Sequence, residues 1–398
     1  MINIAILGYG TIGSGVAEII DRNNDILKKR IGDDIAVKKI LDLRDFPGDV
    51  NESKITHDYD EILNDDEINI VVECMGGVEP AYTFVKKALL KNKSVTTSNK
   101  ALVAVHGSEL INIARDLNIN FTFEASVGGG IPIIRSILKC LTSENILEIT
   151  GILNGTTNFM MTKMSEEGSD YDDVLKEAQS LGYAEADPTA DVEGHDSCRK
   201  IAILTSLVCG KQVDFEKIHT EGISKITATD IKYAKVMGRS IKLLATSRKE
   251  GDSYYALVAP MLLTSDHPLY NVNGVFNAVF VKGDMLGDSM FYGSGAGKLP
   301  TASAVVADIV DMSKHLHVNI YVDWENEELA LADYRKSRKR FFVRTSDDES
   351  KVKDTFGNVE FIRVEGISGE IGFITDKMSE EEYEKAASDI NVIQMIRA

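Results

Sequence analysis

From Ile2 to Ile20 the chain runs INIAILGYGTIGSGVAEII: an apolar strand, a glycine-rich turn and an amphipathic helix. The glycines Gly8, Gly10 and Gly13 have the G-x-G-x-x-G spacing of dinucleotide-binding turns. We expect Gly8 to form the tight turn, Gly10 to let the backbone approach a pyrophosphate, and Gly13 to allow close packing of helix on strand. The alternative is a tight turn without a ligand. The strand-turn-helix context favours a dinucleotide, because amide groups at a helix start bind anions.

Short β-branched runs alternate with amphipathic stretches over the first third of the chain. This alternation predicts an α/β fold with a doubly wound parallel sheet of the Rossmann type. The predicted strands are Ile2–Leu7, Val37–Leu41, Ile68–Glu73, Ser94–Thr97 and Asn120–Glu124. A helix from near Ile131 to near Lys139 leads out of this dinucleotide-binding domain, which we place at residues 1–140.

A mixed α+β second domain is predicted for residues 141–299. Its strand-like segments are Ile149–Leu153, Ala256–Leu263 and Val275–Lys282, and its polar helical stretches are Tyr171–Ser180 and Asp196–Cys209. The next stretch, Thr301–His315, is rich in alanine and valine. We expect it to form a helix, within about residues 300–318, that returns to complete the first domain.

The last segment, residues 338–398, has its predicted elements in the order βαββαβ. The strands are Phe341–Arg344, Val359–Val364, Gly369–Thr375 and Val392–Arg397, with helices at Asp348–Thr355 and Ser379–Asp389. This order predicts a small ferredoxin-like module.

Composition excludes several classes of protein. A formal net charge of -18 over 398 residues disfavours nucleic acid as a partner, and the only dense basic run is Arg335–Arg340. No apolar segment is long enough to predict a membrane span. The four cysteines lack the paired spacing of disulfide frameworks or thiolate zinc sites. We therefore expect reduced thiols and a cytoplasmic location.

The choice between NAD and NADP depends on the end of the second strand, where the candidates disagree. Asp42 could accept a hydrogen bond from a ribose 2'-hydroxyl and favour NAD. Lys39 or Arg44 could instead neutralise a 2'-phosphate and favour NADP. Spacing alone leaves both possibilities open.

Two further segments follow predicted strands of the first domain. Thr97–Lys100 ends one strand, so Lys100 is a site candidate, with an ordinary exposed lysine as the alternative. Glu124–Pro132 places a carboxylate before three glycines. One carboxylate with backbone oxygens suits a hard, monovalent cation, whereas the alternative is a glycine-rich hinge.

The most informative segment is the acidic loop Gly182–Lys200. It contains Glu185 and Asp191, and it ends with Asp196 and Lys200 at positions i and i+4 of a predicted helix. A surface ion pair is the alternative interpretation for Asp196 and Lys200. The loop holds more carboxylates than one lysine requires, which favours a functional site.

Taken together, these segments resemble homoserine dehydrogenases. The family pattern G-Y-x-E-x-D-P-x-x-D-x-x-G-x-D-x-x-x-K matches Gly182–Lys200 without a gap. Further family-like blocks, in the family's order, are Thr97–Lys100, Glu124–Pro132, Asn154–Asn158 and Gly293–Ser303. The resemblance covers most of the chain, from the glycine-rich turn to the helix at Thr301.

The resemblance implies reversible hydride transfer between a nicotinamide and L-aspartate 4-semialdehyde, giving L-homoserine for threonine, methionine and isoleucine biosynthesis. Lys200 would stabilise or protonate the forming alkoxide, with Lys100 close by. Glu185 and Asp196, supported by Asp191, would hold the amino and hydroxyl groups of the substrate.

The same resemblance implies a sodium ion, bound by Glu124 and the carbonyl groups of Val127, Gly129 and Ile131. It also implies a homodimer or larger homo-oligomer formed through the second domain. The residues implied to line the NAD or NADP site are Gly8, Gly10, Thr11, Ile12, Gly13, Arg44, Gly76, Ser98, Lys100, Gly182 and Gly295.

The C-terminal module resembles the ACT domains that bind amino-acid effectors, but Thr345–Ser350 lacks the family's Asp-Arg-Pro-Gly type of turn. We therefore expect the module to serve only assembly, without threonine inhibition. Two rival functions remain. A semialdehyde dehydrogenase would need an activated cysteine, which no segment here provides. A non-catalytic NAD(P)-binding regulator would not need Lys200 or Glu185.

Overall fold

The computed structural model describes every residue from Met1 to Ala398, and the chain forms two compact units. Unit 1 comprises Met1–Asn145, Ala202–Phe215 and Phe291–Ala330. Unit 2 comprises Ile146–Ile201, Glu216–Met290 and Leu331–Ala398. None of the helices has the length and apolar composition needed to cross a bilayer.

Unit 1 contains the predicted parallel sheet, with six strands in the order β3-β2-β1-β4-β5-β6. This is the strand order of dinucleotide-binding folds, so the predicted fold class is confirmed. The strands are β1 (Ile2–Leu7), β2 (Ile35–Leu41), β3 (Ile55–Thr56), β4 (Ile68–Glu73), β5 (Ser94–Thr97) and β6 (Phe121–Thr122).

Two edge features of this sheet differ from the sequence prediction. The short strand β3 was not predicted. The strand predicted for Asn120–Glu124 was too long, because the chain turns into a 3-10 helix at Glu124–Ser126 immediately after β6. The helix predicted next is also irregular: α6 spans Ile133–Arg135 and continues as a π-helix over Ser136–Cys140.

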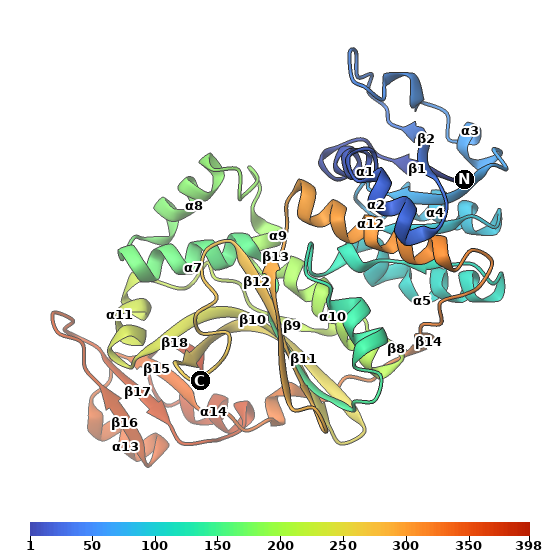
Figure 1. Ribbon diagram of the computed structural model, residues 1–398. Helices are drawn as coiled ribbons and strands as arrows, with labels where there is room; N and C mark the ends of the chain where they lie inside the picture. The colour runs from blue at the N-terminus through green and yellow to red at the C-terminus, as the bar shows by residue number, and fades with distance from the viewer. The chain divides into compact units, whose positions relative to one another are not determined.

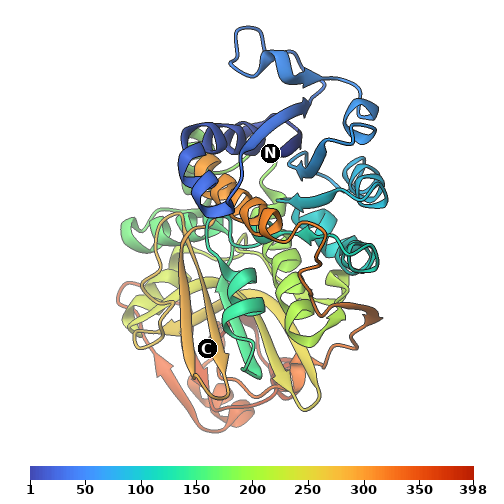
Figure 2. The same ribbon diagram turned by 45° about the vertical axis from the view of Figure 1, so that its right-hand side comes forward.

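The helix after residue 297 packs within unit 1, as Figures 1 and 2 show for α12 (Lys298–Lys314) beside α1 (Thr11–Arg22). A Cβ atom at Gly15 would lie only 3.0 Å from the Cβ of Ala302, so glycine permits this close helix crossing. Buried side chains of both helices join the core beneath β1. The remaining helices of this unit include α2 (Asn24–Ile31), α3 (Asp60–Leu63), α4 (Ala81–Leu90) and α5 (Lys100–Asp116).

Unit 2 is built around long antiparallel strands, of which β10 and β11, twelve residues each, form a hairpin. The principal strands are β7 (Ile146–Ile152), β10 (Arg239–Glu250), β11 (Ser253–Thr264), β12 (Phe276–Gly283) and the part of β13 (Asp288–Ser294) up to Met290. The helices are α7 (Gly155–Glu167), α8 (Tyr171–Ser180), α9 (Thr189–Val192), α11 (Ala228–Val236) and the part of α10 (His195–Cys209) up to Ile201. Strands β10 and β13 were not predicted from the sequence.

The C-terminal elements have the predicted βαββαβ order and the sheet order β18-β15-β17-β16. They are β15 (Phe341–Thr345), α13 (Glu349–Phe356), β16 (Val359–Ile362), β17 (Ile371–Thr375), α14 (Glu380–Ala387) and β18 (Val392–Arg397). The module does not form a sheet of its own, because β18 pairs with β11 at Met261 and Arg397. Its strands therefore extend the sheet of unit 2.

Candidate active site

The glycine-rich turn in unit 1 has the geometry that the spacing predicts. Gly8 has a positive φ of 93°, and a Cβ at Gly13 would lie 1.9 Å from the carbonyl oxygen of Gly8. A Cβ at Gly10 would meet nothing within 4 Å, so this side of the turn is open. Thr11 and Ile12 begin α1, and their amide groups have no acceptor within the helix. The turn can therefore receive an anion.

Asp42 directly follows β2 and faces this turn. Its Oδ2 accepts a hydrogen bond from the amide of Tyr9 at 2.8 Å, and Arg44 donates to the same carboxylate from its backbone and its guanidinium. The guanidinium of Arg44 is the main reason that the pKa of Asp42 falls to about 2. Lys39 instead forms an ion pair with Glu61 at 2.7 Å. Of the two cations considered from the sequence, only Arg44 contacts Asp42.

A buried carboxylate that the sequence analysis missed joins the ends of β4 and β5. Glu73 accepts from the hydroxyl of Thr97 at 2.5 Å and from the amide of Met75 at 2.7 Å, and its carbonyl accepts from the amide of Ser98. Burial raises the pKa of Glu73. These bonds hold Ser98 beside Lys100, the first residue of α5. A cation at a helix N-terminus does not stabilise the helix, which favours a functional role for Lys100.

The other glycines implied to line the cofactor lie in different parts of the chain. Gly76 follows β4 with a φ of 121°, and Gly295 lies close to Gly129, whose Cβ would be 2.3 Å from the Gly295 carbonyl oxygen. Gly182 belongs to unit 2, where it ends the turn after α8 with a φ of 74°.

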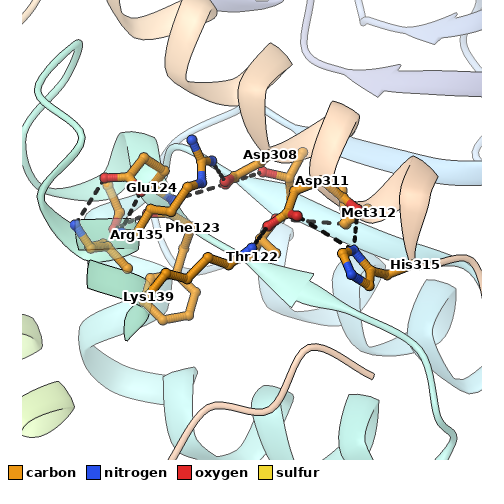
Figure 3. Close-up of polar contacts among 12 residues, drawn as sticks. Thr122, Phe123, Glu124, Arg135, Lys139, Asp308, Asp311, Met312 and His315 are labelled. Carbon is orange, nitrogen blue, oxygen red and sulfur yellow. Dashed lines mark hydrogen bonds and ion pairs between the residues drawn. The ribbon is translucent and has the colours of Figure 1, made fainter. Parts of the chain in front are cut away.

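Glu124 lies at the centre of a buried charged cluster, shown in Figure 3. Its two carboxylate oxygens accept from the amides of Ile134 (2.9 Å) and Arg135 (2.7 Å) at the start of α6. Its own amide donates to Asp308 on α12, which also pairs with the guanidinium of Arg135 at 2.5 Å. Burial, followed by the nearby Asp308, raises the pKa of Glu124 to about 7.

The three carbonyl groups predicted as cation ligands belong to the turn that follows Glu124. The carbonyl oxygens of Val127 and Gly129 accept no hydrogen bond, whereas that of Ile131 accepts from the amide of Ile133. Glu124 and Asp308 are 2% and 4% exposed, and the guanidinium of Arg135 pairs with Asp308 only. The cluster of three side chains therefore has a net charge of -1 when both carboxyls are ionised. A monovalent cation would neutralise it.

In unit 2, Asp196 and Lys200 form a buried ion pair rather than the surface pair considered above. The pair spans one turn of α10, with Nζ of Lys200 2.7 Å from Oδ2 of Asp196. Nζ also donates to the carbonyl of Leu153, at 2.7 Å, where β7 has just ended. Lys200 is only 8% exposed. Its ammonium group is therefore held by two oxygens in a shielded position.

Asn154 links the carboxylates of this site, a role that the sequence analysis did not assign. Its Nδ2 donates to Asp191 at 2.7 Å and to Asp196 at 3.0 Å. Its Oδ1 caps α7 by accepting from the amide of Thr157. The position of Asn154 directly after a strand and before Gly155 is the local signal for this N-cap.

Glu185 does not share these contacts. Its side chain is exposed, and its backbone carbonyl accepts from the side chain of Gln179 at 3.1 Å. The structure thus brings together Asp191, Asp196 and Lys200, but it places Glu185 on the outer part of the same loop.

The cysteines do not have the setting of a catalytic thiolate. Burial raises the pKa of Cys74 and of Cys209, which disfavours their nucleophilic forms. Cys198 is buried within α10, and Cys140 is exposed at the end of the π-helix. This argues against thioester chemistry of the semialdehyde dehydrogenase kind.

Two family models match the chain: "Homoserine dehydrogenase, NAD binding domain" over residues 8–124 and "Homoserine dehydrogenase" over residues 132–310. The homoserine dehydrogenase of Bacillus subtilis is 43% identical over 80% of this chain and 74% of its own. That of Synechocystis is 40% identical over 93% of this chain and 86% of its own. The chain belongs to the homoserine dehydrogenase family. It is therefore an NAD(P)-dependent oxidoreductase that interconverts L-aspartate 4-semialdehyde and L-homoserine.

Solved structures of homoserine dehydrogenases agree with this assignment. The crystal structure of the Thiobacillus denitrificans homoserine dehydrogenase covers 100% of this chain and 97% of that one, with a TM-score of 0.91 and 34% identity. A hyperthermophilic archaeal homoserine dehydrogenase in complex with NADPH covers 78% of this chain and 97% of that one, with a TM-score of 0.68 and 34% identity. The non-catalytic regulator considered above is not favoured.

Proposed function

We propose that Lys200 is the proton donor of the reduction. When bound, the dinucleotide would supply a hydride to C4 of the semialdehyde, so that negative charge would develop on the aldehyde oxygen. Lys200 transfers a proton from Nζ to this oxygen, which yields the hydroxyl group and leaves a neutral amine that regains a proton from water. The observation that supports this role most strongly is the buried contact of Nζ with Asp196 and Leu153. Both oxygens accept hydrogen bonds from the ammonium group and hold it in a fixed position.

The acidic loop is proposed to bind the substrate. Asp196 and Asp191 are held side by side by Asn154, so together they present negative charge to the α-ammonium group and hydrogen-bond acceptors to the hydroxyl group. Glu185, exposed on the same loop, would complete this binding. Lys100 at the start of α5 is proposed to assist Lys200. Gly76, Ser98, Gly182 and Gly295 are proposed to line the cofactor.

The test of this proposal is an assay of semialdehyde-dependent oxidation of NADH and NADPH by the purified protein. We expect a decrease in absorbance that requires both the semialdehyde and the protein, and the reverse reaction with homoserine. Protein that binds NADH or NADPH but oxidises neither of them in the presence of the semialdehyde would contradict the proposed function.

A sodium ion is proposed at Glu124 and the carbonyls of Val127, Gly129 and Ile131. The donor set fits, because it combines the carbonyl oxygens of Val127 and Gly129, which accept no hydrogen bond, with a carboxylate in a cluster whose net charge is -1 when both carboxyls are ionised. Bound there, the ion would order the turn between β6 and α6 and compensate the buried charge.

Exchanging sodium chloride for choline chloride is expected to destabilise the protein. Because the ion binds the folded chain only, sodium at ten to one hundred times its Kd should contribute about 1–3 kcal/mol. Thermal unfolding in matched concentrations of the two salts measures this. Glu124→Gln should lose most of the difference between the salts. An equal melting temperature of the wild-type protein in both salts would count against the ion.

Assembly and location are also proposals. We infer a homodimer or larger homo-oligomer working in the cytoplasm, consistent with four free thiols. In the C-terminal module, Asp347 follows β15 and accepts from the amide of Asn391 and from Lys351. This loop is thus closed by contacts within the module, and we propose that the module serves assembly. Light scattering measures the oligomeric state, and repeating it with threonine tests whether this amino acid changes that state.

A further inference from the structure

A cavity of about 580 Å³ opens beside the glycine-rich turn of unit 1. Gly8 and Gly10 form one wall, and the ends of β2 and β4 form another. Its apolar lining includes Leu41, Pro80 and Phe84, which suit the faces of an adenine ring. Its charged or titratable lining includes Asp42, Arg44 and His57, which lie near the end of β2, where the adenosine ribose binds in folds of this kind.

Asp42 is held in place by the turn itself. The amide of Tyr9, between the first two glycines, donates to Oδ2, so the carboxylate faces the turn that receives the pyrophosphate. Only 9% of the Asp42 side chain is exposed. An ionised carboxylate fixed in this position accepts hydrogen bonds from a ribose diol and repels a 2'-phosphate, which carries about -2 at neutral pH.

The cations near the cavity are already matched by carboxylates. Arg44 donates to Asp42 from Nε at 3.0 Å and from Nη2 at 3.1 Å. The ring of His57 contacts the carbonyl of Asp42 and the carboxylate of Asp45. Lys39 is paired with Glu61. A 2'-phosphate would therefore enter a region without a surplus of positive charge.

The contacts of Arg44 also explain how a ribose can displace it. The carboxylate of Asp42 has about four acceptor sites. Tyr9 uses one and Arg44 uses three, one from its backbone amide and two from its guanidinium. The Arg44 side chain is 63% exposed, so water replaces its guanidinium contacts readily. Two ribose hydroxyls can then take the sites that the guanidinium leaves.

We propose that Asp42 accepts the ribose hydroxyl groups of NAD(H) and that the enzyme uses NADH in preference to NADPH. This preference rests on the proposed function, because one of the measurements that test it is turnover of the semialdehyde. The 2'-phosphate of NADPH would lie beside the carboxylate of Asp42, and such a pair of like charges weakens binding. We therefore expect kcat/KM for NADH to exceed that for NADPH by roughly tenfold or more.

The experiment compares wild type with Asp42→Asn and with Asp45→Asn as a matched control. Asp45 is 81% exposed and makes no contact with the turn. Its replacement by asparagine removes the same charge at a nearby position. In wild type, NADH should be preferred. In Asp42→Asn, kcat/KM for NADH should fall and that for NADPH should rise, so that the ratio drops by roughly tenfold. In Asp45→Asn the ratio should stay within about twofold, as for an exposed charge.

Titration calorimetry with NAD⁺ and NADP⁺ on all three proteins separates this inference from the proposed function. If no protein turns over but wild type binds NAD⁺ more tightly, the catalytic proposal fails and the assignment of Asp42 stands. Wild-type preference for the phosphorylated dinucleotide, or equal affinity for both, would overturn the assignment. So would an equal change of ratio in the two variants. Thermal unfolding of each variant verifies that it is folded.

Discussion

Replacing Lys200 by methionine is expected to lower kcat for semialdehyde reduction by roughly 10²–10⁴-fold, the usual contribution of a positioned acid or base. Methionine keeps the length of the side chain but has neither a proton to donate nor a charge to stabilise the alkoxide. The affinity for the dinucleotide should change little, because Lys200 lies on α10 among the carboxylates of unit 2. Steady-state kinetics and dinucleotide titration measure the two effects separately.

Two variants make this result specific to Lys200. Lys200→Arg preserves the positive charge but is a poor proton donor, so a large loss of kcat in this variant indicates proton transfer rather than charge alone. Lys163→Met is the control, because Lys163 also forms an i, i+4 pair, with Glu167, but at a half-buried position on α7 outside the candidate site. It should retain nearly full activity. Turnover of Lys200→Met within about tenfold of wild type would exclude Lys200 as the main donor.

The elements with local periodicity were predictable from the sequence. The main parallel strands of unit 1, β1, β2 and β4, are rich in apolar residues and alternate with helices, so their positions follow from composition. Helix α8 was predicted with its observed bounds, since its apolar residues Val174 and Ala178 recur with helical spacing. The βαββαβ order of the last segment followed from the same local patterns.

The missed strand β10 depends on contacts that no local pattern shows. Lys242 interrupts its apolar run and is 2% exposed. Its ammonium group is accommodated by Asn158 on α7 and by Val272 and Asn273 in the loop before β12. A lysine inside an apolar run disfavours a buried strand, unless distant residues supply these oxygens.

In the candidate active site, too, local spacing was predictable from the sequence, whereas contacts with distant residues were not. The helical spacing of Asp196 and Lys200 was enough to place them on one face of α10. Their burial was not predictable, because it comes from Leu153 and Asn154, about forty residues earlier in the chain. Likewise, Glu73 ends a predicted strand, but its contact with Thr97 requires the neighbouring strand β5.

A second buried ion cluster joins the C-terminal strand to the rest of unit 2. The guanidinium of Arg397 donates to both oxygens of Glu221, at 2.7 and 2.9 Å, and to both oxygens of Glu380 on α14. Its side chain is 2% exposed. Although burial raises the pKa of Glu221, hydrogen bonds from His219 and Arg397 lower it to about 2.

The segment after Glu221 supports the substrate loop. The amide of Ile223 donates to the carbonyl of Val192 at 2.8 Å. A Cβ atom at Gly222 would lie 2.2 Å from the same oxygen, so only glycine allows this approach. Val192 is adjacent to Asp191 in the proposed substrate site. The ion cluster around Arg397 is thus connected to the proposed substrate site through the backbone from Glu221 to Ile223.

Arg397→Met is expected to lower the free energy of unfolding by about 3–5 kcal/mol at neutral pH, because Glu221 and Glu380 lose their buried counter-ion. KM for the semialdehyde should rise, and KM for the dinucleotide should not. Urea denaturation and steady-state kinetics measure these effects. Arg338→Met is the control, since Arg338 contacts the exposed Glu382, and it should cost less than about 1 kcal/mol.

The dependence on pH gives a further check on the Arg397 cluster. In wild type the folded pKa of Glu221 is below its ordinary value of 4.5, so this stabilisation is present above pH 4.5 and is lost as the pH falls towards 2. In Arg397→Met the uncompensated carboxylates bind protons at higher pH, which relieves the cost of their charge. The difference in stability between the two proteins should therefore be smaller at pH 5 than at pH 7.5. A difference that stays constant would mean that Arg397 acts through packing of its side chain rather than through its charge.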